Sequence, residues 1–157
     1  MIVITPYGMA LVSQDLFKMS HGYEEGEKFC LAKYYLYCAS IEIGLKAAIL
    51  AVDCTEAKKK HIFSLRHDLC KVRASFETVY SSIWNNADIE AVEKINPFFK
   101  KKGLEYFTPD VRAAAVHGYS EFPEIGHMAA AAQKVNALLV THKLFIEAKT
   151  SDMPRGA

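Results

Sequence analysis

The chain has 157 residues, of which 51% are hydrophobic and 24% charged, and this length suits one domain with a sizeable core. Its 19 basic and 18 acidic residues give a formal net charge of +1, which excludes a strongly basic nucleic-acid coat protein but not a local basic site. With only 8 Gly and 5 Pro, the composition also excludes a disordered or collagen-like chain.

Two long helices are predicted in the first third of the chain. No proline occurs between Pro6 and Pro97, so long helices can form without interruption. The apolar spacing predicts one helix over 8–20 and a second over 24–53. The second helix carries apolar residues at steps of three, four or seven, and these positions predict its buried face: Phe29, Ala32, Leu36, Ile43, Ala47 and Leu50. Gly44 inside this helix predicts close packing, because glycine there costs about 1 kcal/mol relative to alanine.

The middle of the chain alternates polar connectors with shorter helices. Residues 58–61 predict a polar connector, and a third helix is expected over 65–83. The face of that helix is set by Leu69, Val72, Phe76, Val79 and Tyr80. A break at Asn85 and Asn86 and a helix over 87–96 follow. Pro97 and residues 100–103 are then expected to form a loop.

Two further helices are predicted near the C-terminus. A short helix is expected over 109–117, with Thr108 as a possible N-cap and Gly118 at its end. The last helix is expected over 123–149. Its apolar stripe steps by three and four residues: Met128, Ala132, Val135, Leu139, His142 and Ile146. A histidine on such a stripe is typical of a buried or interface side chain with its polar atoms satisfied.

These elements predict an all-α fold, an antiparallel four- to five-helix up-down bundle. Residues 1–5 form the only β-branched run, which would need a partner strand from a second subunit. We expect a single domain over 1–149 and a frayed tail over 150–157.

The sequence favours a cytoplasmic protein. No basic residue precedes the apolar N-terminal stretch, so a signal peptide is not expected. The most apolar segment, 39–52, is interrupted by Ser40, Glu42 and Lys46, which favours a core helix over a membrane span. Four cysteines without C-x-x-C spacing favour reduced thiols: Cys30, Cys38, Cys54 and Cys70.

No metal or cofactor is expected. Glu124 and His127 have the Glu-x-x-His spacing of di-iron bundles, but no second such motif occurs in the chain.

Three stretches occur in the order found in one known family. In the second helix, Glu42 is followed four residues later by Lys46 and then alanine. The stretch Leu65-Arg-His-Asp-Leu69 resembles a G-H-D-L signature, with Arg66 where Gly is usual. The stretch Arg112-Ala-Ala-Ala-Val-His117 fits an Arg-to-His pattern with four to six intervening residues. Over about 29–146 the chain therefore resembles HEPN domains.

The resemblance implies a helical bundle that dimerises. Catalytic HEPN domains are metal-independent ribonucleases in which the Arg and His of both subunits meet at the dimer interface. Many belong to toxin–antitoxin or phage-defence systems. Other members lack a working motif and bind nucleotides, RNA or a nucleotidyltransferase partner. The expected function is thus metal-independent RNA cleavage by a homodimer, and the alternative is a non-catalytic module that binds nucleotide, RNA, a nucleotidyltransferase or an antitoxin.

Arg112 and His117 have the residue types that this chemistry requires. Histidine can move protons near neutral pH, and arginine binds phosphate through a planar, permanently charged fork. Five positions on a regular helix separate two side chains by about 140°, so convergence needs unwinding near Gly118 or a second copy across a two-fold axis. The other interpretation is that Arg112 forms a surface ion pair and His117 packs near a turn.

The remaining polar motifs favour structural roles. His67 and Asp68 are expected to cap the third helix and fasten its loop to the second helix, rather than to form a catalytic dyad. Glu42 and Lys46 have the i, i+4 spacing and polarity of a helix-stabilising pair. The lysines of 58–60 and 100–102 could contact phosphates but are more typical of solvated surface. The second helix also carries Tyr34, Tyr35 and Tyr37, which favour packing over one stacking platform.

Overall fold

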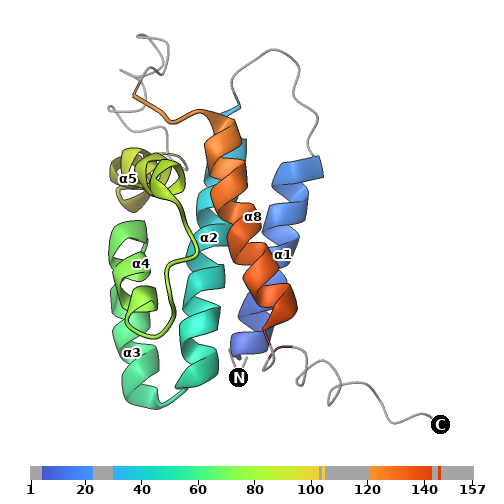
Figure 1. Cartoon of the computed structure of the whole chain (residues 1–157). Coiled ribbons are helices and arrows are strands. Elements are labelled where there is room, and N and C mark those ends of the chain that lie inside the picture. Colours follow the sequence, from blue (N-terminus) through green and yellow to red (C-terminus); the bar gives the residue numbers. More distant parts are fainter. Residues whose placement is uncertain (1–4, 23–29, 103, 105–120, 143–144, 146–157) are drawn as a thin grey trace, which may run out of the picture.

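The computed structural model describes residues 5–22, 30–102, 104, 121–142 and 145 of the chain. Within these ranges the backbone forms six helices and no strand (Figure 1). The predicted all-α class is therefore confirmed for this part of the protein. The predicted helix over 109–117, the tail over 150–157 and all but the last residue of the β-branched run lie outside the described residues.

Helices α1 (Pro6–Gly22) and α2 (Leu31–Val52) form an antiparallel pair. The Ser13 hydroxyl donates to the Ser40 carbonyl over 2.7 Å, and the Ser40 hydroxyl donates to the Ser13 carbonyl over 2.8 Å. Nearer the end of α1, the Tyr37 hydroxyl lies 3.4 Å from Nδ1 of His21. At the start of α1, the side chain of Thr5 accepts the Gly8 N–H over 3.0 Å. Small and hydroxylated residues thus let the two backbones approach closely.

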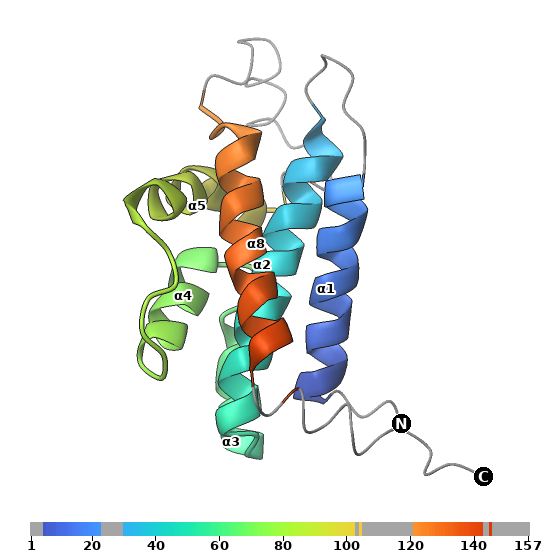
Figure 2. The same ribbon diagram turned by 45° about the vertical axis from the view of Figure 1, so that its right-hand side comes forward.

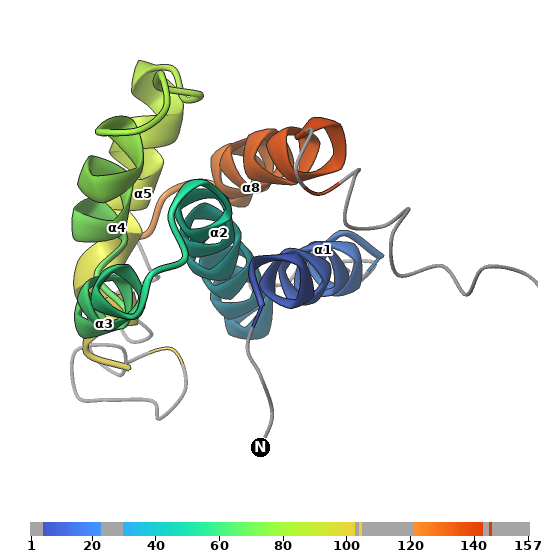
Figure 3. The same ribbon diagram turned by 90° about the horizontal axis from the view of Figure 1, so that it is seen from below.

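Helix α2 is the centre of the bundle (Figure 3). Helices α1 and α8 lie against one side of it, and α3, α4 and α5 lie on the other. In all, 14 of its 22 residues are buried. The predicted single buried face was therefore wrong in detail: Ala32 is exposed and Leu36 and Ile43 are only half-buried. A helix that is surrounded by neighbours has no solvent stripe to create a clear period.

Helix α8 (Ile125–Thr141) runs parallel to α2. At one end the Tyr34 hydroxyl donates to the Pro123 carbonyl over 2.6 Å. At the other end the Tyr80 hydroxyl donates to the α2 carbonyl of Ala48 over 2.7 Å and lies 2.8 Å from Nε2 of His142, the C-cap of α8. The predicted stripe is confirmed at four buried positions: Met128, Ala132, Val135 and Leu139.

Three shorter helices complete the described fold: α3 (Glu56–Ser64), α4 (Leu69–Glu77) and α5 (Asn86–Lys100) (Figure 2). The predicted connector over 58–61 was wrong, because these residues lie inside α3, whose first turn is capped by Thr55 accepting the Lys58 N–H over 3.3 Å. Proline at 97 also fails to end α5. Pro97 lies in the last turn, where losing one backbone N–H removes little of the helix ladder.

The predicted third helix over 65–83 was too long. Asp68 caps α4 at its start, and Thr78 is its C-cap. Of the predicted face, Leu69, Val72 and Phe76 are buried, so this part is confirmed. The non-helical residues before Asp68 include Arg66, which has a positive φ of 49° that no regular helix can contain.

Helix α2 also has the length and apolar composition that a membrane span requires. Of its most apolar 18-residue window, 72% is buried inside the bundle, and core helices of soluble proteins meet the same criteria. The helix also contains three charged side chains: Lys33 in its first turn, and the buried Glu42 and Lys46.

Replacing Asn85 by alanine is expected to lower the free energy of unfolding by about 1 kcal/mol, because it removes the N-cap of α5. The Asn85 side chain accepts the Asp88 N–H over 2.9 Å, and the Asp88 carboxylate accepts the Asn85 N–H over 2.9 Å. Urea unfolding of Asn85→Ala and of its neighbour Asn86→Ala measures the difference. Equal stability of the two variants would show that the cap contributes nothing.

Candidate functional site

The predicted catalytic residues Arg112 and His117 lie outside the described residues, within 105–120. Beyond that gap, Phe122 is buried and meets the Tyr34 ring edge-on at 5.3 Å. Phe122 also contacts the ring of Phe98 near the end of α5, with ring centroids 4.6 Å apart. On the other side of the gap, Leu104 is buried in the same core. The described residues that flank Arg112 and His117 therefore belong to the core at the end of the bundle where α2 begins and α5 ends.

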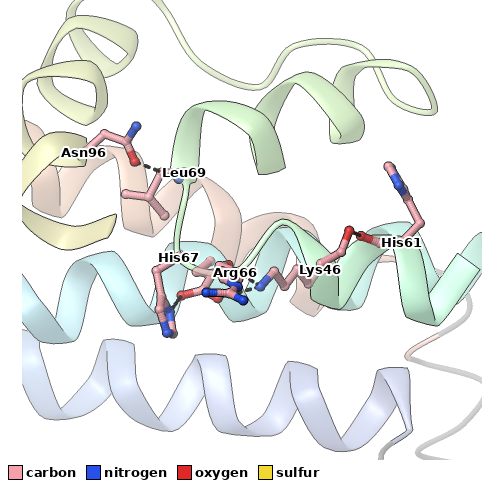
Figure 4. A network of polar contacts seen from close by, with 8 residues as sticks. Lys46, His61, Arg66, His67, Leu69 and Asn96 are labelled. Atoms are coloured by element: carbon pink, nitrogen blue, oxygen red, sulfur yellow. Dashed lines mark hydrogen bonds and ion pairs between the residues drawn. The ribbon is translucent and has the colours of Figure 1, made fainter. Parts of the chain in front are cut away.

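The other two motif stretches meet in a buried polar network (Figure 4). Lys46 donates to Oε1 of Glu42 over 2.6 Å, and both residues are almost fully buried, with exposed fractions of 4% and 6%. Nδ1 of His67 lies 3.0 Å from Oε2 of the same carboxylate. Each carboxylate oxygen of Glu42 therefore has one partner: Lys46 from the same motif stretch and His67 from the next one. Because a carboxylate only accepts, Nδ1 of His67 carries a hydrogen.

A second set of contacts joins the start of α4 to α5. Oδ1 of Asp68 accepts the Lys71 N–H over 3.2 Å, which caps the helix. The Asn96 side chain donates to Oδ1 of Asp68 over 3.0 Å and accepts the Leu69 N–H over 2.8 Å. The structural interpretation of His67 and Asp68 is confirmed, since one fastens the loop to α2 and the other caps α4.

Arg66, in the turn before Asp68, has a backbone conformation that is uncommon for a residue with a side chain. Its φ of 49° lies in the left-handed region, which glycine adopts without steric cost. In this conformation its carbonyl accepts from Nζ of Lys46 over 2.6 Å. The Arg66 side chain is exposed. The left-handed turn therefore places the Arg66 carbonyl where it can accept a hydrogen bond from the buried Lys46.

Asp68 has a lowered pKa, although its environment acts in both directions. Partial burial alone would raise the pKa of its carboxyl. The hydrogen bonds from the Asn96 side chain and the Lys71 N–H, together with the charges of Lys100 and Lys71, outweigh this effect of burial. The net effect favours the ionised carboxylate in the folded protein.

Stability is expected to fall as the pH drops below about 4, partly because Asp68 becomes protonated. A carboxylate with a lowered folded-state pKa stabilises the fold above its unfolded pKa, and this contribution is lost as the pH falls through the folded value. Asp68→Asn should therefore be less stable than wild type at pH 7 and show a flatter pH dependence below 4. The control is Asp15→Asn, at an exposed position of α1. If the free energies of unfolding of wild type and Asp68→Asn change by the same amount between pH 2 and pH 7, the assignment is contradicted.

Glu124 and His127 do not form a metal centre with other described residues. Their side chains are 88% and 50% exposed, and Nε2 of His127 lies 3.8 Å from the Glu124 carboxylate. No group of three or more His, Cys, Asp or Glu residues suited to a metal occurs in the described part of the chain.

The four cysteines are all unpaired. Cys38 is fully buried, and burial, followed by the charge of Glu42, raises the pKa of its thiol. It is therefore a core residue without thiolate character.

The tyrosines of α2 also pack as expected. Tyr34 and Tyr37 are buried and Tyr35 is half-buried, so they line the core and do not form one exposed platform.

The hydrogen bond between Tyr80 and His142 is a contact that sequence reasoning missed. It gives His142 the partner expected for a histidine on an apolar stripe, but no local signal joins residues 62 positions apart. The Tyr80 ring also stacks on Phe76 at 4.7 Å, and burial raises the pKa of its hydroxyl.

No protein-family model, curated protein or solved structure matches the chain.

Proposed function

We propose that the chain is a HEPN-like ribonuclease, an up-down bundle that acts as a homodimer and cleaves RNA without a metal through Arg112 and His117. One observation carries the proposal. The Glu42 carboxylate joins Lys46 of its own motif stretch to His67 of the next stretch, 25 positions further along the chain.

This contact supports the resemblance because chance matches in sequence need not meet in space. Burying a charge pair costs several kcal/mol per ion unless its hydrogen bonds are complete. Here the lysine has two acceptors and the carboxylate has two donors. The motif residues thus act as one structural unit, which is what a shared family signature would require.

The proposed chemistry divides between the two side chains. Cleavage needs a base that removes the proton of a 2′-hydroxyl, an acid that protonates the leaving 5′-oxygen, and a cation beside the phosphate. His117 would transfer the protons, since its reference pKa of about 6.5 permits both states near neutral pH. Arg112 would hold the phosphate with its fork of N–H donors. A second copy across a two-fold axis would supply the other histidine.

The RNA is expected to bind at the end of the bundle where α2 begins and α5 ends. The described residues that flank 105–120 belong to the core at that end, through Leu104 and Phe122. Lys100, which is 44% exposed, lies in the last turn of α5. A few basic groups doubled by dimer symmetry would suffice, given the formal charge of only +1.

The test is cleavage of labelled RNA in EDTA by wild type, His117→Ala and Arg112→Ala. The control is His127→Ala, which removes a histidine that is 50% exposed on α8. We expect each of the two site variants to lose 10²-fold or more of the activity, on the order of what one proton-transfer group contributes, and the control to keep it. Mixing the two inactive variants should restore part of the activity if the site is composite. Equal cleavage by wild type and His117→Ala would exclude this site.

The alternative is a non-catalytic HEPN-like module that binds RNA, a nucleotide or a partner such as a nucleotidyltransferase or an antitoxin. The near balance of 19 basic and 18 acidic residues favours the nucleotide- or partner-binding form of this alternative, because surfaces that bind long RNA are typically basic. RNA binding without cleavage in the same assay would support it.

A further inference from the structure

We propose that Arg66 and His67 form a phosphate-binding site at the turn between α3 and α4. The site would take the phosphate group of an RNA strand or of a free nucleotide. The choice of RNA as the source of the phosphate rests on the proposed function. The site itself involves neither Arg112 nor His117.

His67 is held on one side and open on the other. Nδ1 lies 3.0 Å from the buried Glu42 carboxylate, and the ring meets Phe99 edge-on with centroids 5.7 Å apart. The side chain is nevertheless 37% exposed, and Nε2 makes no hydrogen bond to any described residue. A fixed imidazole with one nitrogen directed away from its anchor is suited to contact a ligand.

The local charge favours an anion. Lys46 already compensates the Glu42 carboxylate at 2.6 Å, so a proton on His67 would add a net positive charge. The Arg66 side chain is exposed and forms no ion pair with the described residues. The Lys100 side chain is 44% exposed and lies 3.8 Å from the Asp68 carboxylate, which compensates its charge. Arg66 therefore carries a positive charge that no described carboxylate pairs with, and His67 would add a second donor with a proton on Nε2.

A structural role explains His67 but leaves the choice of arginine at position 66 unexplained. The turn needs only the Arg66 carbonyl, which accepts from Lys46 over 2.6 Å. Glycine would supply that carbonyl without the cost, about 1–2 kcal/mol, of a left-handed backbone at a residue with a side chain. Arginine occupies this position although its side chain has no ionic partner among the described residues. Figure 4 shows that its guanidinium and the His67 imidazole extend from the same turn. Binding of a phosphate group by the Arg66 side chain would explain why arginine occupies this position.

The test measures binding of a fluorescein-labelled single-stranded RNA by anisotropy. Full-length protein carrying His117→Ala is used, so that cleavage does not interfere. Inorganic phosphate and adenosine monophosphate serve as competitors. Competition by the two small molecules would identify a site for free phosphate groups, and competition only by unlabelled RNA would identify a strand-binding site.

Three variants are compared in that background. Arg66→Gly keeps the turn, and His67→Asn keeps an N–H donor for Glu42 while removing Nε2. Lys60→Ala removes one exposed charge from α3 and is the control. We expect Arg66→Gly to weaken binding about tenfold or more, the effect of losing a charge-assisted contact, and His67→Asn to weaken it severalfold. The control should bind like its parent.

Folding and activity are read separately from binding. Arg66→Gly should unfold at the same temperature as its parent or higher, so weaker binding could not be attributed to misfolding. Unchanged binding by both Arg66→Gly and His67→Asn, or no binding of RNA, phosphate or nucleotide by the parent, would overturn the proposal. Phosphate binding that depends on Arg66 would support this site even if the wild-type protein cleaves no RNA. Failure of the ribonuclease proposal can therefore be distinguished from failure of this one.

Discussion

Replacing Lys46 by methionine is expected to lower the free energy of unfolding by about 3–5 kcal/mol, because the buried Glu42 carboxylate loses its cation. Methionine matches the length of the lysine stem, so the effect comes from charge and hydrogen bonds and not from a cavity. The lysine makes two short contacts, each of 2.6 Å, to the Glu42 carboxylate and the Arg66 carbonyl. With only 4% of Lys46 exposed, water cannot readily replace it.

The matched control is Lys59→Met. Lys59 also pairs with a glutamate, Glu56, over 2.9 Å, but the Glu56 side chain is 91% exposed. Removing this surface pair should change stability by no more than about 1 kcal/mol. The double variant Glu42→Leu with Lys46→Met should be more stable than Lys46→Met alone, because no uncompensated charge then remains buried. Equal effects of Lys46→Met and Lys59→Met in urea unfolding would show that the network contributes little.

Replacing Gly44 by alanine is expected to destabilise the protein by about 1–3 kcal/mol, although alanine is the better helix former. A Cβ atom at this position would lie 2.5 Å from Cγ1 of Val135 and 2.6 Å from the Ser13 hydroxyl oxygen. These atoms belong to α8 and α1, so the added methyl group would push two helices away from α2. Overpacking between three fixed helices outweighs the gain in propensity of about 1 kcal/mol.

Gly126 provides the control for this substitution. It lies in the first turn of α8, and a Cβ atom there would meet nothing within 4 Å. Gly126→Ala should therefore leave stability unchanged or raise it by up to about 1 kcal/mol. In a Val135→Ala background, Gly44→Ala should cost less, since one of the two closest atoms is gone. Thermal unfolding in which Gly44→Ala stabilises the protein as much as Gly126→Ala would refute the close packing of α1, α2 and α8.

The helices that could be predicted are those with one buried side. The stripe of α8 and the face of α4 follow their apolar spacing, and the close packing at Gly44 was expected from its position in a helix. The lysine run of 58–60 led to the wrong prediction of a connector where α3 lies. Charged residues can form a helix when only one side of it is buried, and Ile62 is the buried residue of α3. The orientation of α8 parallel to α2 depends on contacts such as Tyr34 with Pro123, which no local pattern encodes.

The polar network could be predicted only in part. The i, i+4 spacing of Glu42 and Lys46 indicates their pair, but not that both are buried. Sequence periodicity says nothing about the contact of Glu42 with His67, because the two residues are 25 positions apart on different elements. The left-handed backbone of Arg66 was equally unpredictable from arginine, which disfavours it. The glycine expected from the family resemblance was the one signal that pointed to this turn.

The nature of the RNA ends after incubation in EDTA tests the proposed ribonuclease most directly. The substrate is a labelled single-stranded RNA, compared with the same strand carrying 2′-deoxynucleotides throughout. If His117 removes the proton of a 2′-hydroxyl that attacks the adjacent phosphate, wild-type protein should cut only the RNA and leave 2′,3′-cyclic phosphate ends. Cleavage of both strands at similar rates, or no cleavage of either by the purified protein, would contradict the proposal.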